Sequence, residues 1–139
     1  MIRTEIEIKG WHVIVWMAVD NIYIERIIDD VKAIGGKNLK RVRTSLDSLC
    51  KRNHGLTYTA YDFQSSVMVI GKTTSKAEFL NTLTHEICHL ALHLSKYFNL
   101  NPYSEEVCYM AGDIAFALYR EASLMMCDCH KDELIKEKL

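Results

Sequence analysis

Five consecutive residues of this 139-residue chain, His85-Glu86-Ile87-Cys88-His89, form an HExxH pattern. In an α-helix, positions i and i+4 lie on one face about 6 Å apart, so both imidazoles can reach one metal ion. The carboxylate of Glu86, next to the first histidine, can then take a proton from a water molecule near that ion. The pattern therefore predicts a zinc site with His85 and His89 as ligands and Glu86 as general base.

A catalytic zinc site usually has three protein ligands, which leaves the fourth position to water. His93 is not expected to be the third, because eight helical residues place it about 12 Å from His85, and we predict a surface position at the helix edge. The remaining candidates are Glu105 and Glu106, 16 and 17 residues after His89, where a helix folding back can present a carboxylate. Acidic residues in a first helical turn are also favoured by the helix dipole, whatever their function.

The helix that carries the HExxH motif is expected to be long. Ser75 and Glu78 have the spacing of a capping box, and the helix should run to about Phe98, ahead of Pro102. It carries two apolar stripes: Leu83, Ile87, Leu90 and Leu94 form one, and Cys88, Ala91 and Leu92 form a second on the histidine-bearing side. We therefore expect it to pack between a sheet and another helix, with both histidines shielded from water.

Strand and helix patterns alternate along the rest of the chain. Alternating apolar residues predict a strand around residues 5–9, a nearly continuous apolar run predicts a central strand at 11–19, and β-branched and aromatic residues predict a hairpin of 56–61 with 67–70. Helical spacing appears at 24–34, at 39–49 and from Ser104 to about Met126. The order β-β-α-α-β-β-α-α predicts an α+β fold, and the length suits a single domain over residues 1–139.

Composition narrows the classes of partner. The chain is 49% hydrophobic and 25% charged, with a formal net charge of −1, which excludes disorder and gives no overall attraction to nucleic acid or to an anionic membrane. The longest apolar run, residues 13–19, is too short to span a bilayer, and the first residues do not read as a signal peptide. We expect a soluble cytoplasmic protein with five reduced cysteines and no membrane partner.

Residues 55–117 carry a resemblance to a known family. Its motifs are Gly55-Leu56-Thr57-Tyr58, Ser66-Val67-Met68-Val69-Ile70-Gly71, Glu78-Phe79-Leu80-Asn81-Thr82, the HExxH and Tyr103-Ser104-Glu105-Glu106-Val107-Cys108-Tyr109-Met110-Ala111-Gly112-Asp113. With them the chain resembles small zincin-like proteins of phages and gut bacteria, and more broadly it is similar to gluzincin metallopeptidases of minimal size. These motifs span under half of the chain.

The resemblance implies a zincin-like fold, in which a mixed or antiparallel sheet packs on the HExxH helix and on a following helix that bears a ligand Glu. In the family pattern this Glu stands three residues before the small residue that precedes Tyr-Leu. Cys108 holds the small position here and Met110 the Leu position, which selects Glu105 over Glu106 as the third zinc ligand.

The expected function is zinc-dependent hydrolysis of peptide bonds in a peptide or protein substrate, with Glu86 as general base. The strand at 67–70 is expected to offer the edge on which an extended substrate pairs. Tyr103, Tyr109 and His54 are unranked candidates for stabilising the oxyanion.

The alternative function is that of a catalytically inactive, zinc-stabilised interaction module. It would use the basic helix at 37–52, whose cations are Lys37, Lys40, Arg41, Arg43, Lys51 and Arg52, to hold nucleic acid. No aromatic or glycine-rich motif accompanies these cations, so a solvated helix face is the preferred interpretation and nucleic acid is not the expected partner. The string Cys127-Asp128-Cys129-His130 is interpreted as a helix end with free thiols rather than a second metal site.

Overall fold

The computed structural model describes residues 1–49 and 54–127. Its strands are β1 (Ile2–Ile8), β2 (Trp11–Val19), β3 (Gly55–Ala60) and β4 (Ser65–Gly71), and its helices are α1 (Ile24–Ala33), α2 (Leu39–Leu49), α3 (Lys76–Tyr97), α4 (Glu105–Ala117) and α5 (Tyr119–Met126), with 3-10 turns at Asn21–Tyr23 and Tyr61–Phe63. The predicted α+β class and order of elements are confirmed. The last predicted helix is divided, because the backbone leaves helical geometry at the buried Leu118 (φ −96°, ψ 5°).

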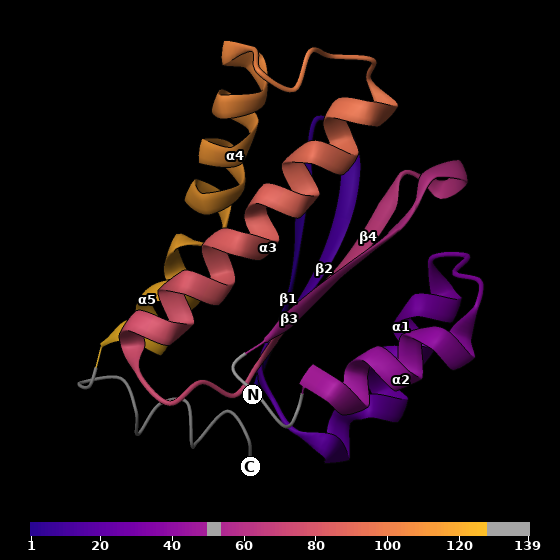
Figure 1. The fold of residues 1–139 in the computed structure, drawn as a ribbon, viewed down its shortest axis with the longest axis vertical. Coiled ribbons are helices and arrows are strands. Elements are labelled where there is room, and N and C mark those ends of the chain that lie inside the picture. Colours follow the sequence, from indigo (N-terminus) through magenta and orange to yellow (C-terminus); the bar gives the residue numbers. More distant parts are fainter. Residues whose placement is uncertain (50–53, 128–139) are drawn as a thin grey trace.

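The four strands form one mixed sheet in the order β1-β2-β4-β3 (Figure 1). β1 pairs antiparallel with β2, β2 parallel with β4, and β4 antiparallel with β3, which confirms the predicted hairpin. The prediction that residues 67–70 offer a free edge is wrong, because they lie in β4 and pair with strands on both sides. The edges of the sheet are β1 and β3.

Helices cover both faces of the sheet (Figure 1). On one face, Val13, Val15 and Met17 of β2 belong to the core formed with α3, α4 and α5. On the other face, Ile14 and Trp16 belong to the core formed with α1 and α2. Because β2 is buried on both faces, its sequence is nearly all apolar rather than alternating, as the run at 11–19 predicted.

Side-chain caps begin the helical segments where the sequence places them. The hydroxyl of Ser75 accepts a hydrogen bond from the backbone N–H of Glu78 (3.1 Å), which fixes the start of α3. The carboxylate of Asp20 accepts one from the N–H of Ile22 (3.3 Å) and caps the 3-10 turn that leads into α1. The Ser75 half of the predicted capping box is thus confirmed.

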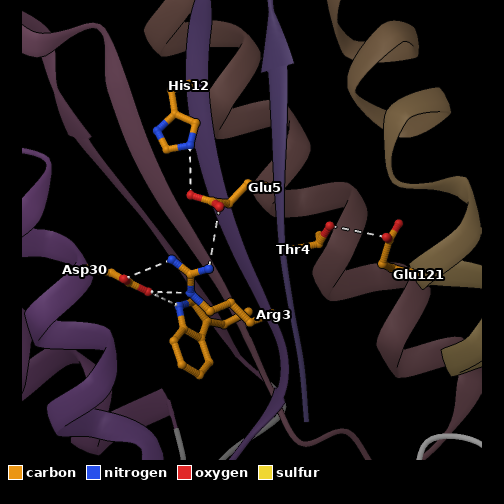
Figure 2. Close-up of polar contacts among 7 residues, drawn as sticks. Arg3, Thr4, Glu5, His12, Asp30 and Glu121 are labelled. Carbon is orange, nitrogen blue, oxygen red and sulfur yellow. Dashed lines mark hydrogen bonds and ion pairs between the residues drawn. The ribbon is translucent and has the colours of Figure 1, made fainter. Parts of the chain in front are cut away.

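Edge strand β1 is tied to the helices of both layers (Figure 2). The carboxylate of Asp30 in α1 accepts two hydrogen bonds from the Arg3 guanidinium (3.0 and 3.1 Å) and one from the indole N–H of Trp16 (2.8 Å). The hydrogen bonds to the Asp30 carboxylate raise the pKa of Arg3 above its ordinary value. The next residue, Thr4, donates from the opposite side of the strand to Glu121 of α5 (3.2 Å).

The cysteines depart from the sequence prediction. Cys127 is disulfide-bonded, so the expectation of reduced cysteines and a thiol-bearing helix end is wrong there, whereas Cys88 and Cys108 are free. The remainder of the Cys127-Asp128-Cys129-His130 string lies outside the described residues. Across residues 1–49 and 54–127, no helix has both the length and the apolar character needed to cross a membrane.

Replacement of Asp30 by Ala should lower the free energy of unfolding by about 1 to 3 kcal/mol, because it leaves the largely buried Trp16 N–H and the Arg3 guanidinium without their acceptor. Urea unfolding measures the change. Asp29→Ala is the matched control, since Asp29 is its exposed neighbour on α1. Equal stability of the two variants would contradict the proposed tie between β1 and α1.

Candidate metal centre

The HExxH motif lies in the middle of α3, and its ionisable side chains converge. The Nε2 atoms of His85 and His89 are 3.1 Å apart, and Oε2 of Glu86 is 4.0 Å from Nε2 of His85. One ligand atom from each of the three side chains lies within 4.8 Å of the others, a spacing that can hold a metal ion. Two imidazole nitrogens and a carboxylate are donors that suit zinc.

The two histidines face solvent, whereas the glutamate between them is buried. The side chain of His85 is 66% exposed and that of Glu86 is 3% exposed. The expectation that the histidines are shielded is wrong, because Cys88 and Leu92 on their side of α3 are exposed as well. The helix does pack between the sheet and α4, as predicted, but its histidine face is left open to water.

Edge strand β3 holds Glu86 in place. The Thr57 hydroxyl donates a hydrogen bond to Oε1 of Glu86 at 2.8 Å. Gly55, two residues earlier on the same face of the strand, lies so close that an added Cβ would stand 2.7 Å from Cγ of Glu86 and 2.8 Å from the Val69 carbonyl oxygen. A glycine at position 55 is therefore required for α3 to approach β3 this closely.

A polar cavity of about 600 Å³ opens on the N-terminal side of His85. It is lined by His54, Gly55, Glu78, Asn81, Thr82, His85 and Glu86. His54 is thus the imidazole outside α3 that shares a cavity with the HExxH motif. Glu78 is seven residues before His85, about 10 Å away along the helix.

Glu105 and Glu106 lie in the exposed first turn of α4, and the structure does not bring either of them into the group of His85, Glu86 and His89. The reason is the arrangement of the layers: α4 contacts α3 and edge strand β1, while Glu86 contacts β3 at the opposite edge of the sheet. Glu105 as third ligand stays a prediction from the resemblance.

His93 is not the surface residue that the sequence suggested. It is half-buried, and its Nδ1 lies 2.7 Å from the hydroxyl of Thr59 in β3. Burial lowers the pKa of His93 below its ordinary value, and electrostatic repulsion from the neighbouring His89 and Lys96 lowers it further. Of the candidates for oxyanion stabilisation, Tyr103 and Tyr109 are 92% and 69% exposed at the α4 end of the fold.

The sequence interpretation missed Gly55, Thr57 and Thr59 as parts of the site. Their signal is a period of two along β3: residues 55, 57 and 59 share the face of the strand that meets α3. A small residue followed by two hydroxyls on that face leaves room for the helix and supplies hydrogen bonds to it.

The alternative function depends on the basic residues at 37–52, and the structure describes only some of them. Arg43 is paired with Glu25 of α1, and the backbone N–H of Lys37 donates to the Tyr58 hydroxyl at 2.7 Å. Lys51 and Arg52 lie outside the described residues. Within the described part, one cation of the cluster is thus already paired inside the protein.

Neither a protein-family model, nor a curated protein, nor a solved structure matches this chain. The function must therefore be inferred from the site itself. Its distinguishing feature is that two solvent-facing imidazoles adjoin a buried carboxylate, with a polar cavity beside them.

Gly55→Ala should destabilise the protein by about 1 to 3 kcal/mol, because the new methyl group meets the Glu86 side chain and a backbone carbonyl that cannot readily move. Chemical unfolding provides the measurement. Gly112→Ala in α4 is the control: a Cβ there meets nothing within 4 Å, and helix propensity should leave stability unchanged or raise it by up to about 1 kcal/mol. A Gly55→Ala variant as stable as the control would show that Glu86 does not depend on this approach.

Proposed function

We propose that the chain is a zincin-like, zinc-dependent metallopeptidase that hydrolyses peptide bonds. The observation that carries the proposal is the HExxH geometry: Nε2 atoms 3.1 Å apart on the exposed face of α3, beside a Glu86 carboxylate that is 3% exposed. Gly55 and Thr57 of the neighbouring strand hold the Glu86 side chain in a fixed place. Two surface histidines without a function would not need this arrangement.

Zinc bound by His85 and His89 would lower the pKa of a water molecule and polarise the substrate carbonyl. Glu86 takes a proton from the water as its oxygen adds to the carbonyl carbon. The C–N bond then breaks, and Glu86 passes that proton to the leaving amine, so the products are a new carboxyl group and a new amine. Since Thr57 occupies Oε1, the other oxygen of Glu86 is the one that faces His85 for this transfer.

The substrate would lie in extended form along β3. Among the described strands β3 pairs only with β4, so its outer edge can receive a peptide by β-augmentation. The same strand positions Glu86 through Thr57, which places the scissile bond beside the general base. The cavity next to His85 would then receive a side chain of the peptide on one side of that bond.

The purified protein should bind about one zinc ion, and His89→Ala should abolish this binding because it removes one of the two imidazoles. For the third ligand we propose His54, which lines the cavity of His85, in preference to Glu105 on α4; neither belongs to the group of His85, Glu86 and His89. We expect His54→Ala to weaken zinc binding by about tenfold or more and Glu105→Gln to change it little. Competition with a chromogenic chelator gives these affinities.

Glu106→Gln is the control for Glu105→Gln, since both side chains lie in the exposed first turn of α4. A loss confined to Glu105→Gln would support the ligand set implied by the resemblance and would mean that α4 moves toward the histidines when metal binds. Protein that takes up no zinc from a zinc-containing buffer would refute the metal site and the proposed function together.

Glu86→Gln should retain zinc but lower peptide turnover by about 10² to 10⁴-fold, because the amide keeps the shape of the side chain and cannot act as a base. A peptide-library digest analysed by mass spectrometry compares wild type, Glu86→Gln and chelator-treated protein. Identical product profiles from wild type and Glu86→Gln would trace the cleavage to a contaminant. A zinc-loaded wild type without cleavage products would favour the alternative, an inactive interaction module.

A further inference from the structure

A chain of hydrogen bonds crosses the sheet and ends on His93. The indole Nε1 of Trp11 in β2 donates to Oγ of Ser66 in β4 (3.0 Å), Oγ of Ser66 lies 2.8 Å from Oγ1 of Thr59 in β3, and Thr59 lies 2.7 Å from Nδ1 of His93. Trp11 and Ser66 are each fully buried. The imidazole is thus held by a polar path that begins in the core.

The direction of donation along these hydrogen bonds follows from Trp11, where the series begins. An indole N–H can only donate, so Ser66 accepts from Trp11 and has its own proton left for Thr59. Thr59 then keeps its own proton, and Nδ1 of His93, at 2.7 Å, is the acceptor that lies beside it. The reverse direction would leave the fully buried Ser66 proton without an acceptor among the described residues, which is costly. This arrangement favours a His93 tautomer with Nδ1 bare and the proton on Nε2.

His93 lies one helical turn beyond His89, and the centroids of their rings are 6.2 Å apart. The polar cavity lies on the other side of the pair, toward the N-terminus of α3. A peptide along β3 would therefore have the cavity at one end of the metal centre and His93 at the other. In the described part of the structure, Nε2 of His93 has no hydrogen-bond partner, so its proton is free for a ligand.

We propose that Nε2–H of His93 donates a hydrogen bond to the carbonyl oxygen of the scissile peptide group, with Thr59 and Ser66 as positioning residues. The inference rests on the proposed function, which assigns no residue to stabilise the negative charge on the substrate oxygen. When water adds to the carbonyl carbon, the π electrons move to the oxygen, which becomes negative. A donor already fixed in place stabilises that charge without reorganisation.

The same tautomer argues against His93 as a zinc ligand. A ligand nitrogen must offer a lone pair, and here the lone pair belongs to Nδ1, which is engaged by Thr59, while Nε2 carries the proton. Loss of His93 should therefore affect substrate turnover and leave metal content unchanged. This combination separates a hydrogen-bond donor from a ligand.

The tautomer can be measured without activity. Nitrogen-15 NMR of the metal-free protein should show His93 with an unprotonated Nδ1 and a protonated Nε2. Thr59→Val should remove this preference, whereas Thr59→Ser, which keeps the hydroxyl, should retain it. A protonated Nδ1 in wild type would make His93 the donor to Thr59 and would overturn the proposal.

The kinetic test compares His93→Leu, His93→Gln and His12→Ala in the zinc-loaded protein. His93→Leu should lower kcat by about 10² to 10³-fold with little change in KM, and it should weaken a phosphinic peptide, which mimics the charged oxygen, to a similar extent. His93→Gln, whose amide can donate, should recover part of both losses. His12→Ala should match wild type, since His12 lies on β2 and binds Glu5 of β1.

The outcomes are distinct. An unchanged kcat and phosphinic-peptide affinity in His93→Leu, with wild type active, would overturn the role of His93 and leave the metallopeptidase intact. Zinc loss in both His93 variants would make His93 a ligand and overturn the proposal as well. A zinc-loaded wild type that cleaves no peptide would refute the proposed function and this inference with it.

Discussion

The contact between Glu86 and edge strand β3 determines the geometry of the whole site. A carboxylate that is 3% exposed must be hydrogen-bonded, and the Thr57 hydroxyl meets that need. The contact forms only because position 55 has no side chain, so α3 lies close against the strand. Once Glu86 points inward at this place, its neighbours on the helix have fixed directions.

Those directions explain how one helix presents both a buried carboxylate and two open imidazoles. Successive helical residues turn by about 100°, so His85 and His89 leave the helix on the side next to Glu86 and reach solvent. His93, one turn later, returns to β3 and meets Thr59. The exposure of the two histidines therefore follows from the burial of Glu86. Their face of α3 lies next to β3, an edge strand of the sheet.

The features that the sequence predicted correctly are local ones. The HExxH spacing, the Ser75 cap and the apolar run of β2 each depend on residues within a few turns or one strand. What the sequence did not reveal depends on which elements become neighbours. Strand order alone decides that residues 67–70 are interior and that β3 is an edge.

The same limit applies to the predicted third ligand. The placing of Glu105 required knowledge of the side of α3 on which α4 packs, and spacing along the chain does not contain it. The contribution of β3 was present in the sequence as Gly55, Thr57 and Thr59 at alternate positions. This pattern alone does not indicate a site, because many strands alternate small and polar residues. Its meaning depends on α3 packing against β3.

The parallel pairing of β2 with β4 has a consequence for the order of folding. These central strands are separated in the chain by α1, α2 and β3, so the sheet closes only after a long loop has been ordered. All four strands precede α3 in the chain. Since Glu86 is held by Thr57 of β3, the presentation of His85 and His89 at the surface depends on this long-range pairing of the strands.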